Sequence, residues 1–164
     1  MNNLNKIKNK ISDKESLKNF LDKNRNKKIV FTNGCFDLLH AGHVAYLQEA
    51  ASLGDKLIVG LNSDASTRRL KGSHRPINPE NERKSILEAL ACVDEVVIFQ
   101  EDTPLQVIKK IKPDVLVKGG DWTPEQIVGS DFVLDRGGEV KSLKFVEGLS
   151  STNIINKILR AYGR

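Results

Sequence analysis

Long hydrophobic runs, cysteines and aromatic residues are all scarce in this sequence. No apolar stretch approaches the roughly 20 residues that a membrane-spanning helix needs, and the first residues lack the apolar core of a signal peptide. The two cysteines, Cys35 and Cys92, form no CxxC pair, and so few cysteines are typical of a reducing compartment. These absences predict a cytoplasmic protein without a membrane partner.

Aromatic residues make up only 5% of the chain, whereas a nucleic-acid-binding face usually combines aromatic and basic side chains. The net charge of +5 is concentrated in residues 1–28, which hold nine lysines and arginines against three acidic residues. The rest of the chain is close to neutral, with seventeen against eighteen. We therefore expect no nucleic-acid partner. Residues 1–27 are interpreted as a basic, solvated helical extension before a domain at residues 28–164.

Strand and helix patterns alternate along that domain. Apolar runs typical of buried parallel strands occur at residues 29–32, 56–61, 95–99 and 115–117, and a fifth strand is expected within residues 139–146. Helical spacing fills the intervals, and Asn78 is predicted to cap a helix that starts at Pro79. The alternation predicts an α/β fold with a doubly wound, Rossmann-like parallel sheet of five strands and helices on both faces. The basic helical extension precedes it.

Two histidines follow the first predicted strand and begin a helical pattern. His40 and His43 are three residues apart, so both imidazoles can face one spot on the first helical turn. Unpaired backbone N–H groups and the helix dipole favour an anion there. Gly34 and Gly42 lack the Cβ atoms that would keep a phosphate from the backbone. The segment predicts a phosphate-binding site, and the alternative is that the histidines only cap the helix.

Polar residues also follow the second predicted strand. Ligands of doubly wound sheets bind beyond the carboxyl ends of the strands, so Asn62 and Asp64 are expected near the histidines. Lys71 and Arg75 lie in the polar stretch that comes next, which suits a mobile loop that closes on anions. The alternative for these charged residues is simple solvation.

Two later segments are expected at the same edge of the sheet. One contains Lys118, Gly119, Gly120 and Asp121, and the other contains Ser150, Ser151 and Thr152. The carboxylate of the first segment can hold a ribose, while its paired glycines let a purine lie against the backbone. The hydroxyl groups of the second can cap the last helix and donate to phosphate oxygens. The alternatives are a tight turn with a solvated charge and plain capping.

The segment His40-Ala41-Gly42-His43 resembles the HxGH signature of the nucleotidyltransferase superfamily. From about residue 28 to residue 158, the chain resembles the heptose 1-phosphate adenylyltransferases, the smaller half of the bifunctional enzymes that make ADP-heptose. The similarity includes residues 32–37, 44–47, 61–66, 69–72, 75–76, 117–121 and 151–155. Ser151 stands where that family commonly has threonine, and Gly120 stands where the wider superfamily usually has an acidic residue. The resemblance does not extend to residues 1–27.

The resemblance implies transfer of AMP from ATP to D-glycero-D-manno-heptose 1-phosphate. Because the leaving pyrophosphate carries much charge, we expect Mg²⁺ on the triphosphate with few protein ligands, and Asp37 is the candidate among them. The resemblance implies His40, His43 and Lys71 as catalytic residues. The nucleotide would be bound by Thr32, Asn33, Gly34, Cys35, Phe36, Gly42, Lys118, Gly119, Asp121, Ser150, Ser151 and Thr152. The sugar phosphate would be bound by Asp37, Asn62, Asp64 and Arg75.

The resemblance also implies a homodimer, and a separate heptose kinase and phosphatase that supply the sugar 1-phosphate. One alternative is a cytidylyltransferase that acts on a polyol or choline phosphate. Another is a catalytically inactive nucleotide sensor or a scaffold, although the intact histidine, lysine and hydroxyl segments argue against it. Pyrophosphate release from ATP or CTP separates the three hypotheses.

Overall fold

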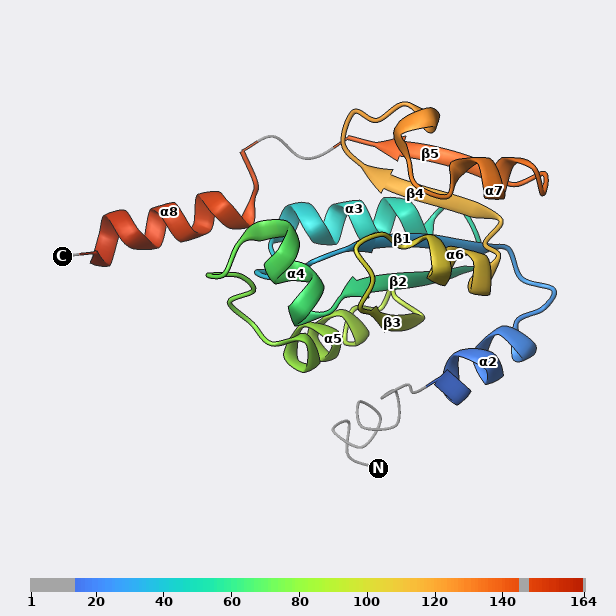
Figure 1. Ribbon diagram of the computed structural model, residues 1–164, viewed down its shortest axis with the longest axis horizontal. Helices are drawn as coiled ribbons and strands as arrows, with labels where there is room; N and C mark the ends of the chain where they lie inside the picture. The colour runs from blue at the N-terminus through green and yellow to red at the C-terminus, as the bar shows by residue number, and fades with distance from the viewer. Residues whose placement is uncertain (1–13, 145–147, 164) are drawn as a thin grey trace.

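A computed structural model describes residues 14–144 and 148–163. Its centre is one sheet of five strands: β1 (Ile29–Gly34), β2 (Lys56–Asn62), β3 (Glu95–Phe99), β4 (Val115–Gly119) and β5 (Glu139–Leu143). The strand order is β3-β2-β1-β4-β5, and all neighbouring strands are parallel (Figure 1). This confirms the predicted doubly wound sheet. The winding reverses between β1 and β4, and ligands of such sheets bind beside that reversal.

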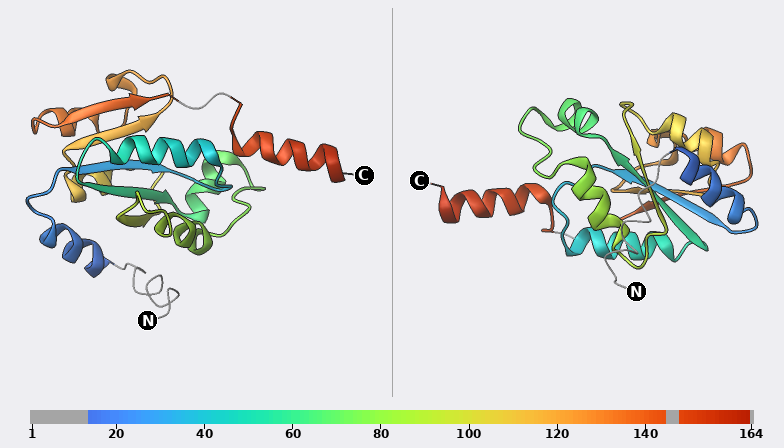
Figure 2. Two further views of the ribbon diagram at one scale, coloured as in Figure 1. Left: turned by 180° about the vertical axis from the view of Figure 1, so that it is seen from behind. Right: turned by 90° about the horizontal axis from the view of Figure 1, so that it is seen from below.

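Helices cover both faces of the sheet (Figures 1 and 2). One face carries α3 (Ala41–Ala51) and α5 (Glu80–Glu88), through residues such as Leu47 and Leu87. The other carries α2 (Lys14–Lys23), α6 (Leu105–Ile111) and α7 (Ser130–Leu134). The short 3₁₀ helix η1 (Pro124–Gln126) precedes α7.

The central strand contributes to both hydrophobic clusters. Val30 packs with the α3 and α5 side, and its neighbour Phe31 packs with the α2, α6 and α7 side; both are 0% exposed. Successive side chains of a strand point to opposite faces. A strand that is buried on both faces therefore needs a continuous apolar run, which is the pattern in the sequence.

The N-terminal extension is present as a helix, but its inner face belongs to the domain. Leu17 of α2 is only 2% exposed and packs in the same cluster as Ile29 and Phe31. The solvated character expected for this segment therefore applies to the outer face of α2. Residues 1–13 of the predicted helical extension lie outside the described residues.

Two local predictions were wrong. The polar stretch from residue 67 to residue 71 was expected as a loop, yet it is the end of helix α4 (Asp64–Lys71). The hydroxyl of Ser63 caps this helix by accepting from the N–H of Ser66 at 3.1 Å, a local bond that apolar periodicity does not reveal. Pro79, and not Asn78, is the N-cap residue of α5. The Asn78 side chain donates instead to the carbonyl of Asp37, at 3.0 Å.

The last helix, α8 (Ser151–Tyr162), extends away from the sheet in every view (Figures 1 and 2). All of its residues are partly or fully exposed. Its apolar residues Ile158, Leu159 and Tyr162 are 51%, 59% and 83% exposed. Across the described ranges, every helix is too short or too polar to cross a membrane.

Candidate active site

The carboxyl ends of the strands and the starts of three helices meet at one edge of the sheet. β1, β2 and β4 end there at Gly34, Asn62 and Gly119. α3 and α4 begin there, and α8 begins beside α3 (Figures 1 and 2). The hydroxyl of Ser151 at the start of α8 donates to the carbonyl of Leu38 in the loop before α3, at 3.0 Å. The expected segments are thus brought together in space.

The histidine pair, His40 and His43, lies at the start of α3. Their rings are stacked, with centroids 3.8 Å apart and an angle of 26° between the planes. His40 is the N-cap residue of α3, but its side chain makes no capping hydrogen bond within the part of the chain that the structure describes. The Nδ1 atoms of both rings are buried and have no hydrogen-bond partner among the described residues. Buried polar atoms are normally bonded, so both rings are suited to bind a ligand.

Burial lowers the pKa of His40, and burial together with the nearby His40 lowers the pKa of His43 to about 4. Both imidazoles are therefore neutral at neutral pH. A neutral imidazole carries one N–H donor, which can bind a phosphate oxygen. The ring of Phe36 lies 5.3 Å from the ring of His43 and borders the pair.

The glycines around the pair make room for side chains. A Cβ atom on Gly42 would lie 3.1 Å from both the Nδ1 of His40 and the Cβ of Leu149. A Cβ atom on Gly34 would lie 3.0 Å from the ring of Phe36. Gly42 therefore allows the His40 ring and the residues before α8 to approach each other, a role beyond the phosphate access expected from the sequence.

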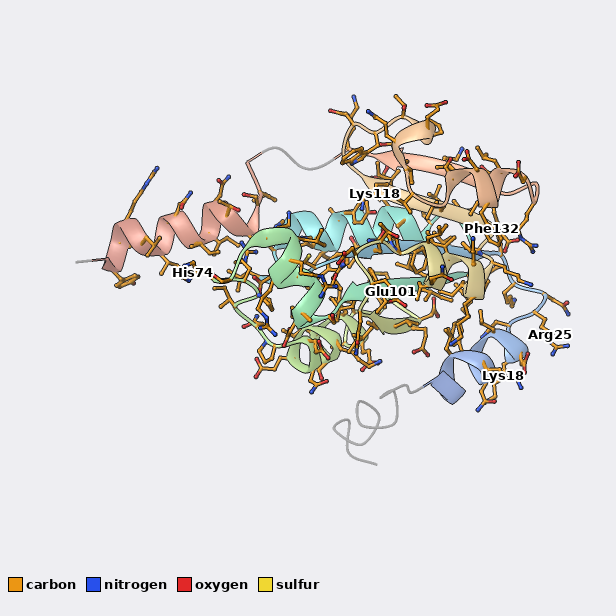
Figure 3. All side chains as sticks on the ribbon, viewed as in Figure 1. Lys18, Arg25, His74, Glu101, Lys118 and Phe132 are labelled. Carbon is orange, nitrogen blue, oxygen red and sulfur yellow. The ribbon has the colours of Figure 1, made fainter. Side chains whose placement is uncertain are left out.

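Two lysines add positive charge to this edge. Lys71 is the last residue of α4 and is exposed. Lys118 is the next-to-last residue of β4 (Figure 3). Burial lowers the pKa of Lys118 and the charge of Lys71 lowers it further, and together they outweigh the opposing effect of the Cys35 sulfur. The positive charge of Lys71 thus acts on Lys118, and both charges favour an anionic ligand at this edge.

Asp37 and Arg75, both predicted to bind the sugar phosphate, are bonded to each other. The Nε atom of Arg75 donates to Oδ2 of Asp37 at 2.5 Å, and Oδ1 accepts from the N–H groups of Ile77 and Asn78 at 2.7 and 2.9 Å. Burial alone would raise the pKa of Asp37, but these donors outweigh it and hold the pKa below its usual value. Asp37 thus anchors the loop that follows α4, and its contact with substrate stays a prediction.

Asn62 and Asp64 are also engaged within the protein. The side chain of Asn62 is buried and donates to the hydroxyl of Ser66 at 2.9 Å. Oδ1 of Asp64 accepts from Arg83, at 2.7 Å. Arg83 was missed by sequence reasoning. The available signal was its position four residues before the core residue Leu87, on the same face of α5.

Most residues predicted to bind the nucleotide lie at this edge. Thr32 is an exception, because its hydroxyl lies in the interior, 2.5 Å from the hydroxyl of Tyr46, whose pKa is raised by burial to about 12. Asn33, Cys35 and Gly119 are partly buried at the strand ends. Ser150 caps α8 by accepting from the N–H of Asn153 at 3.0 Å, while Thr152 and Asp121 are exposed.

The basic N-terminal residues lie elsewhere. Arg25 is at the opposite end of the molecule from His74, which belongs to the loop after α4 (Figure 3). Arg25 also lines a cavity of about 490 Å³, together with other basic residues such as Lys28, Lys112 and Arg136. Its lining contains none of the residues predicted to bind nucleotide or sugar phosphate.

This chain is similar to one part of a group of longer bacterial proteins. The bifunctional protein HldE of Geobacter metallireducens is 66% identical over 142 residues, which are 87% of this chain and 29% of that protein. HldE of Proteus mirabilis is 59% identical over 138 residues, with 84% and 29% covered. The chain thus spans less than a third of the length of these relatives.

Solved structures agree. A lipopolysaccharide core biosynthesis protein from Thermoplasma volcanium has a TM-score of 0.60 at 30% identity, covering 73% of this chain and 97% of that one. A pantothenate synthetase from Thermus thermophilus has a TM-score of 0.60 at 15% identity, covering 84% and 65%, which supports the fold alone. A family model described as cytidylyltransferase-like matches residues 31–157. With that match over most of its length, the chain belongs to the cytidylyltransferase-like family.

Proposed function

We propose that this protein is a nucleotidyltransferase that transfers AMP from ATP to D-glycero-D-manno-heptose 1-phosphate and releases pyrophosphate. The observation that carries the proposal is the stacked histidine pair, whose buried Nδ1 atoms have no hydrogen-bond partner within the described residues. The resemblance to heptose 1-phosphate adenylyltransferases selects ATP and the heptose phosphate as substrates. Membership of the cytidylyltransferase-like family supports nucleotidyl transfer as the reaction class.

The proposed chemistry requires little from the protein beyond placement and charge. A sugar 1-phosphate is ionised at neutral pH, so its oxygen can attack the α-phosphorus of ATP without a general base. The bond from the α-phosphorus to the oxygen of the β-phosphate breaks, and pyrophosphate leaves. Catalysis then consists of holding the two substrates in line and stabilising negative charge on the transferring group.

The residues divide this work between them. The histidine pair would donate N–H groups to oxygens of the α- and β-phosphates, at the start of α3 where the helix dipole also favours an anion. Lys71 would approach from the end of α4, and Lys118 from β4. The exposed hydroxyl of Thr152 and the N–H groups at the start of α8 would bind the β- and γ-phosphates.

Mg²⁺ is proposed to arrive with the triphosphate. The described residues contain no group of three histidine, cysteine, aspartate or glutamate side chains that would hold a metal ion by themselves. The most buried carboxylate near the site, that of Asp37, is already bonded to three N–H donors. The ion would neutralise charge on the departing pyrophosphate.

The test is pyrophosphate release from ATP or CTP, each paired with heptose 1-phosphate, glycerol 3-phosphate or choline phosphate. We expect rapid release only with ATP and heptose 1-phosphate. Comparable release with CTP and a polyol or choline phosphate would establish the cytidylyltransferase alternative, which the name of the family favours. Absence of release with every pair would instead indicate a nucleotide sensor or a scaffold.

The partners are proposals as well. We propose a separate kinase and phosphatase as suppliers of the sugar 1-phosphate, so this chain alone should not phosphorylate heptose 7-phosphate. We also propose a homodimer, and the exposed apolar residues of α8, such as Leu159, support it. Light scattering after gel filtration would give the mass in solution, and a monomer at micromolar concentration would refute the dimer.

A further inference from the structure

Arg83 of α5 is a buried cation at the carboxyl edge of the sheet. Its side chain is 0% exposed. Burial of a charge is unfavourable unless the charge is paired and fully hydrogen-bonded. Replacing a whole buried ion pair by apolar residues of similar volume is often neutral or stabilising, so a buried charge is weak evidence for a role in stability. The partners of the guanidinium group therefore indicate what the charge is used for.

The guanidinium group donates to four acceptors. Its Nη1 atom donates to the carbonyls of Cys35 and Asn62, at 2.6 and 2.9 Å. Its Nη2 atom donates to Oδ1 of Asp64 at 2.7 Å, and its Nε atom donates to the carbonyl of Asn78 at 2.9 Å. Three nitrogens on one rigid plane thus hold four separate positions of the chain.

Each of these positions supports part of the candidate active site. Cys35 lies in the loop that leads to the histidine pair, directly after β1. Asn62 ends β2, and Asp64 begins α4, whose last residue is Lys71. The guanidinium group therefore connects the segment that carries the histidines to the helix that carries the lysine.

Asn78 is held from the other side by Asp37. The backbone N–H of Asn78 donates to Oδ1 of Asp37, and its side-chain amide donates to the carbonyl of Asp37, at 2.9 and 3.0 Å. Its own carbonyl accepts from Arg83. Asn78 thus links the buried cation to the buried carboxylate that anchors Arg75. The loop between α4 and α5 is fixed against the histidine loop by both.

We propose that Arg83 is a positioning residue for the transfer reaction, which fixes the separation between the histidine pair and Lys71. The inference rests on the proposed function, and Arg83 itself touches no substrate. The planar guanidinium is required because its N–H donors point in fixed directions within one plane. A lysine ammonium is a single point and cannot reach all four acceptors at once.

The test compares two neighbouring buried residues of α5. Arg83→Met removes the four hydrogen bonds and keeps a similar volume. Lys84→Met is the matched control, because Lys84 is also buried but donates to the carbonyl of Val96 and pairs with Glu88, away from the histidines. The measurements are the thermal midpoint, kcat at saturating substrates and KM for ATP, taken at a temperature where circular dichroism shows each variant folded.

Arg83→Met should lower kcat at least 10-fold with a smaller change in KM for ATP, while Lys84→Met keeps kcat within about twofold of the wild type. Arg83→Lys retains the charge, so it serves if the methionine variant does not fold, and it should also lose at least 10-fold in kcat. A near-normal kcat in Arg83→Met or Arg83→Lys would overturn the inference. So would an equal loss of kcat in Lys84→Met.

A second readout does not depend on turnover. Amide hydrogen exchange of residues 35–43 and 72–78 should be faster in Arg83→Lys than in Lys84→Met, because Arg83 donates to the carbonyls of Cys35 and Asn78 and Lys84 donates to the carbonyl of Val96. Wild-type protein without pyrophosphate release would refute the proposed function. The exchange data would then still test whether Arg83 holds the two segments in place. Equal exchange in the two variants would refute that role.

Discussion

The hydroxyl of Ser151 donates a hydrogen bond to the carbonyl of Leu38, at 3.0 Å. These residues are far apart in the sequence, and the bond ties the start of α8 to the loop that carries the histidine pair. The exposed Thr152 is the next residue of α8. The bond therefore fixes the start of α8 beside the loop before α3, where we propose that the phosphates bind.

Thr152→Ala should raise KM for ATP with little change in kcat, because a bond made equally to substrate and transition state affects binding only. A hydrogen bond to a charged phosphate contributes roughly 1.5–2 kcal/mol. Its loss corresponds to an increase in KM of about 10- to 30-fold. Initial rates at varied ATP concentration give both constants. A fall in kcat with unchanged KM would contradict the assigned role.

His43→Ala should lower kcat by about 10²–10³-fold, the usual effect of losing one preorganised donor to a developing charge. KM for ATP should change far less, because the remaining groups still bind the ground state. Turnover and the thermal midpoint are measured on the same sample. If the histidine only supported the helix end, the variant would lose about 1 kcal/mol of stability and keep its kcat.

Acid should destabilise the protein through His43. Its pKa is about 4 in the folded protein and 6.5 in an unperturbed chain, so the unfolded state binds more protons between these values. The stabilisation is complete above the unfolded pKa and is lost as the pH falls toward 4. His40 shifts in the same direction. The thermal midpoint should fall between about pH 7 and pH 4.5, less steeply in His43→Ala. Equal slopes for both proteins would refute this account.

Gly42→Ala tests the close approach around the first turn of α3. The added methyl would press on the His40 ring and on Leu149, each 3.1 Å away. Both must move by a few tenths of an ångström, so we expect kcat to fall at least 10-fold, since misplaced catalytic groups are costly. The thermal midpoint should change little, because alanine favours a helix over glycine. Ala45→Gly, at an exposed position of the same helix, is the control and should keep its kcat.

The strands could be predicted from the sequence because each is a short apolar run, and the sheet buries such runs on both faces. The run at residues 56–61, for example, corresponds to β2 with one further residue, Asn62. α4 could not be predicted in this way. Its buried side chains include Ser66 and Thr67, which are polar, so the helix has no apolar period and depends on its cap and on the bonds at its start.

The histidine pair could be predicted from spacing, because three residues along a helix is a fixed geometry. The partners of Asp37 and Asp64 could not, because Arg75 and Arg83 reach them across long intervals of the chain. From the sequence, each of these charges is equally consistent with solvation, substrate binding or an internal ion pair. The folded arrangement shows internal pairs, and assigns Asp37 a structural role in addition to its predicted contact with substrate.

Leu17 has a practical consequence for anyone who shortens the protein. A fragment that starts at residue 28, where the alternation of strands and helices begins, would lack the side chain that covers Ile29 and Phe31. The exposed apolar surface would favour aggregation even though every residue near the histidines is retained. A soluble catalytic fragment should therefore begin at or before Lys14, the first residue of α2.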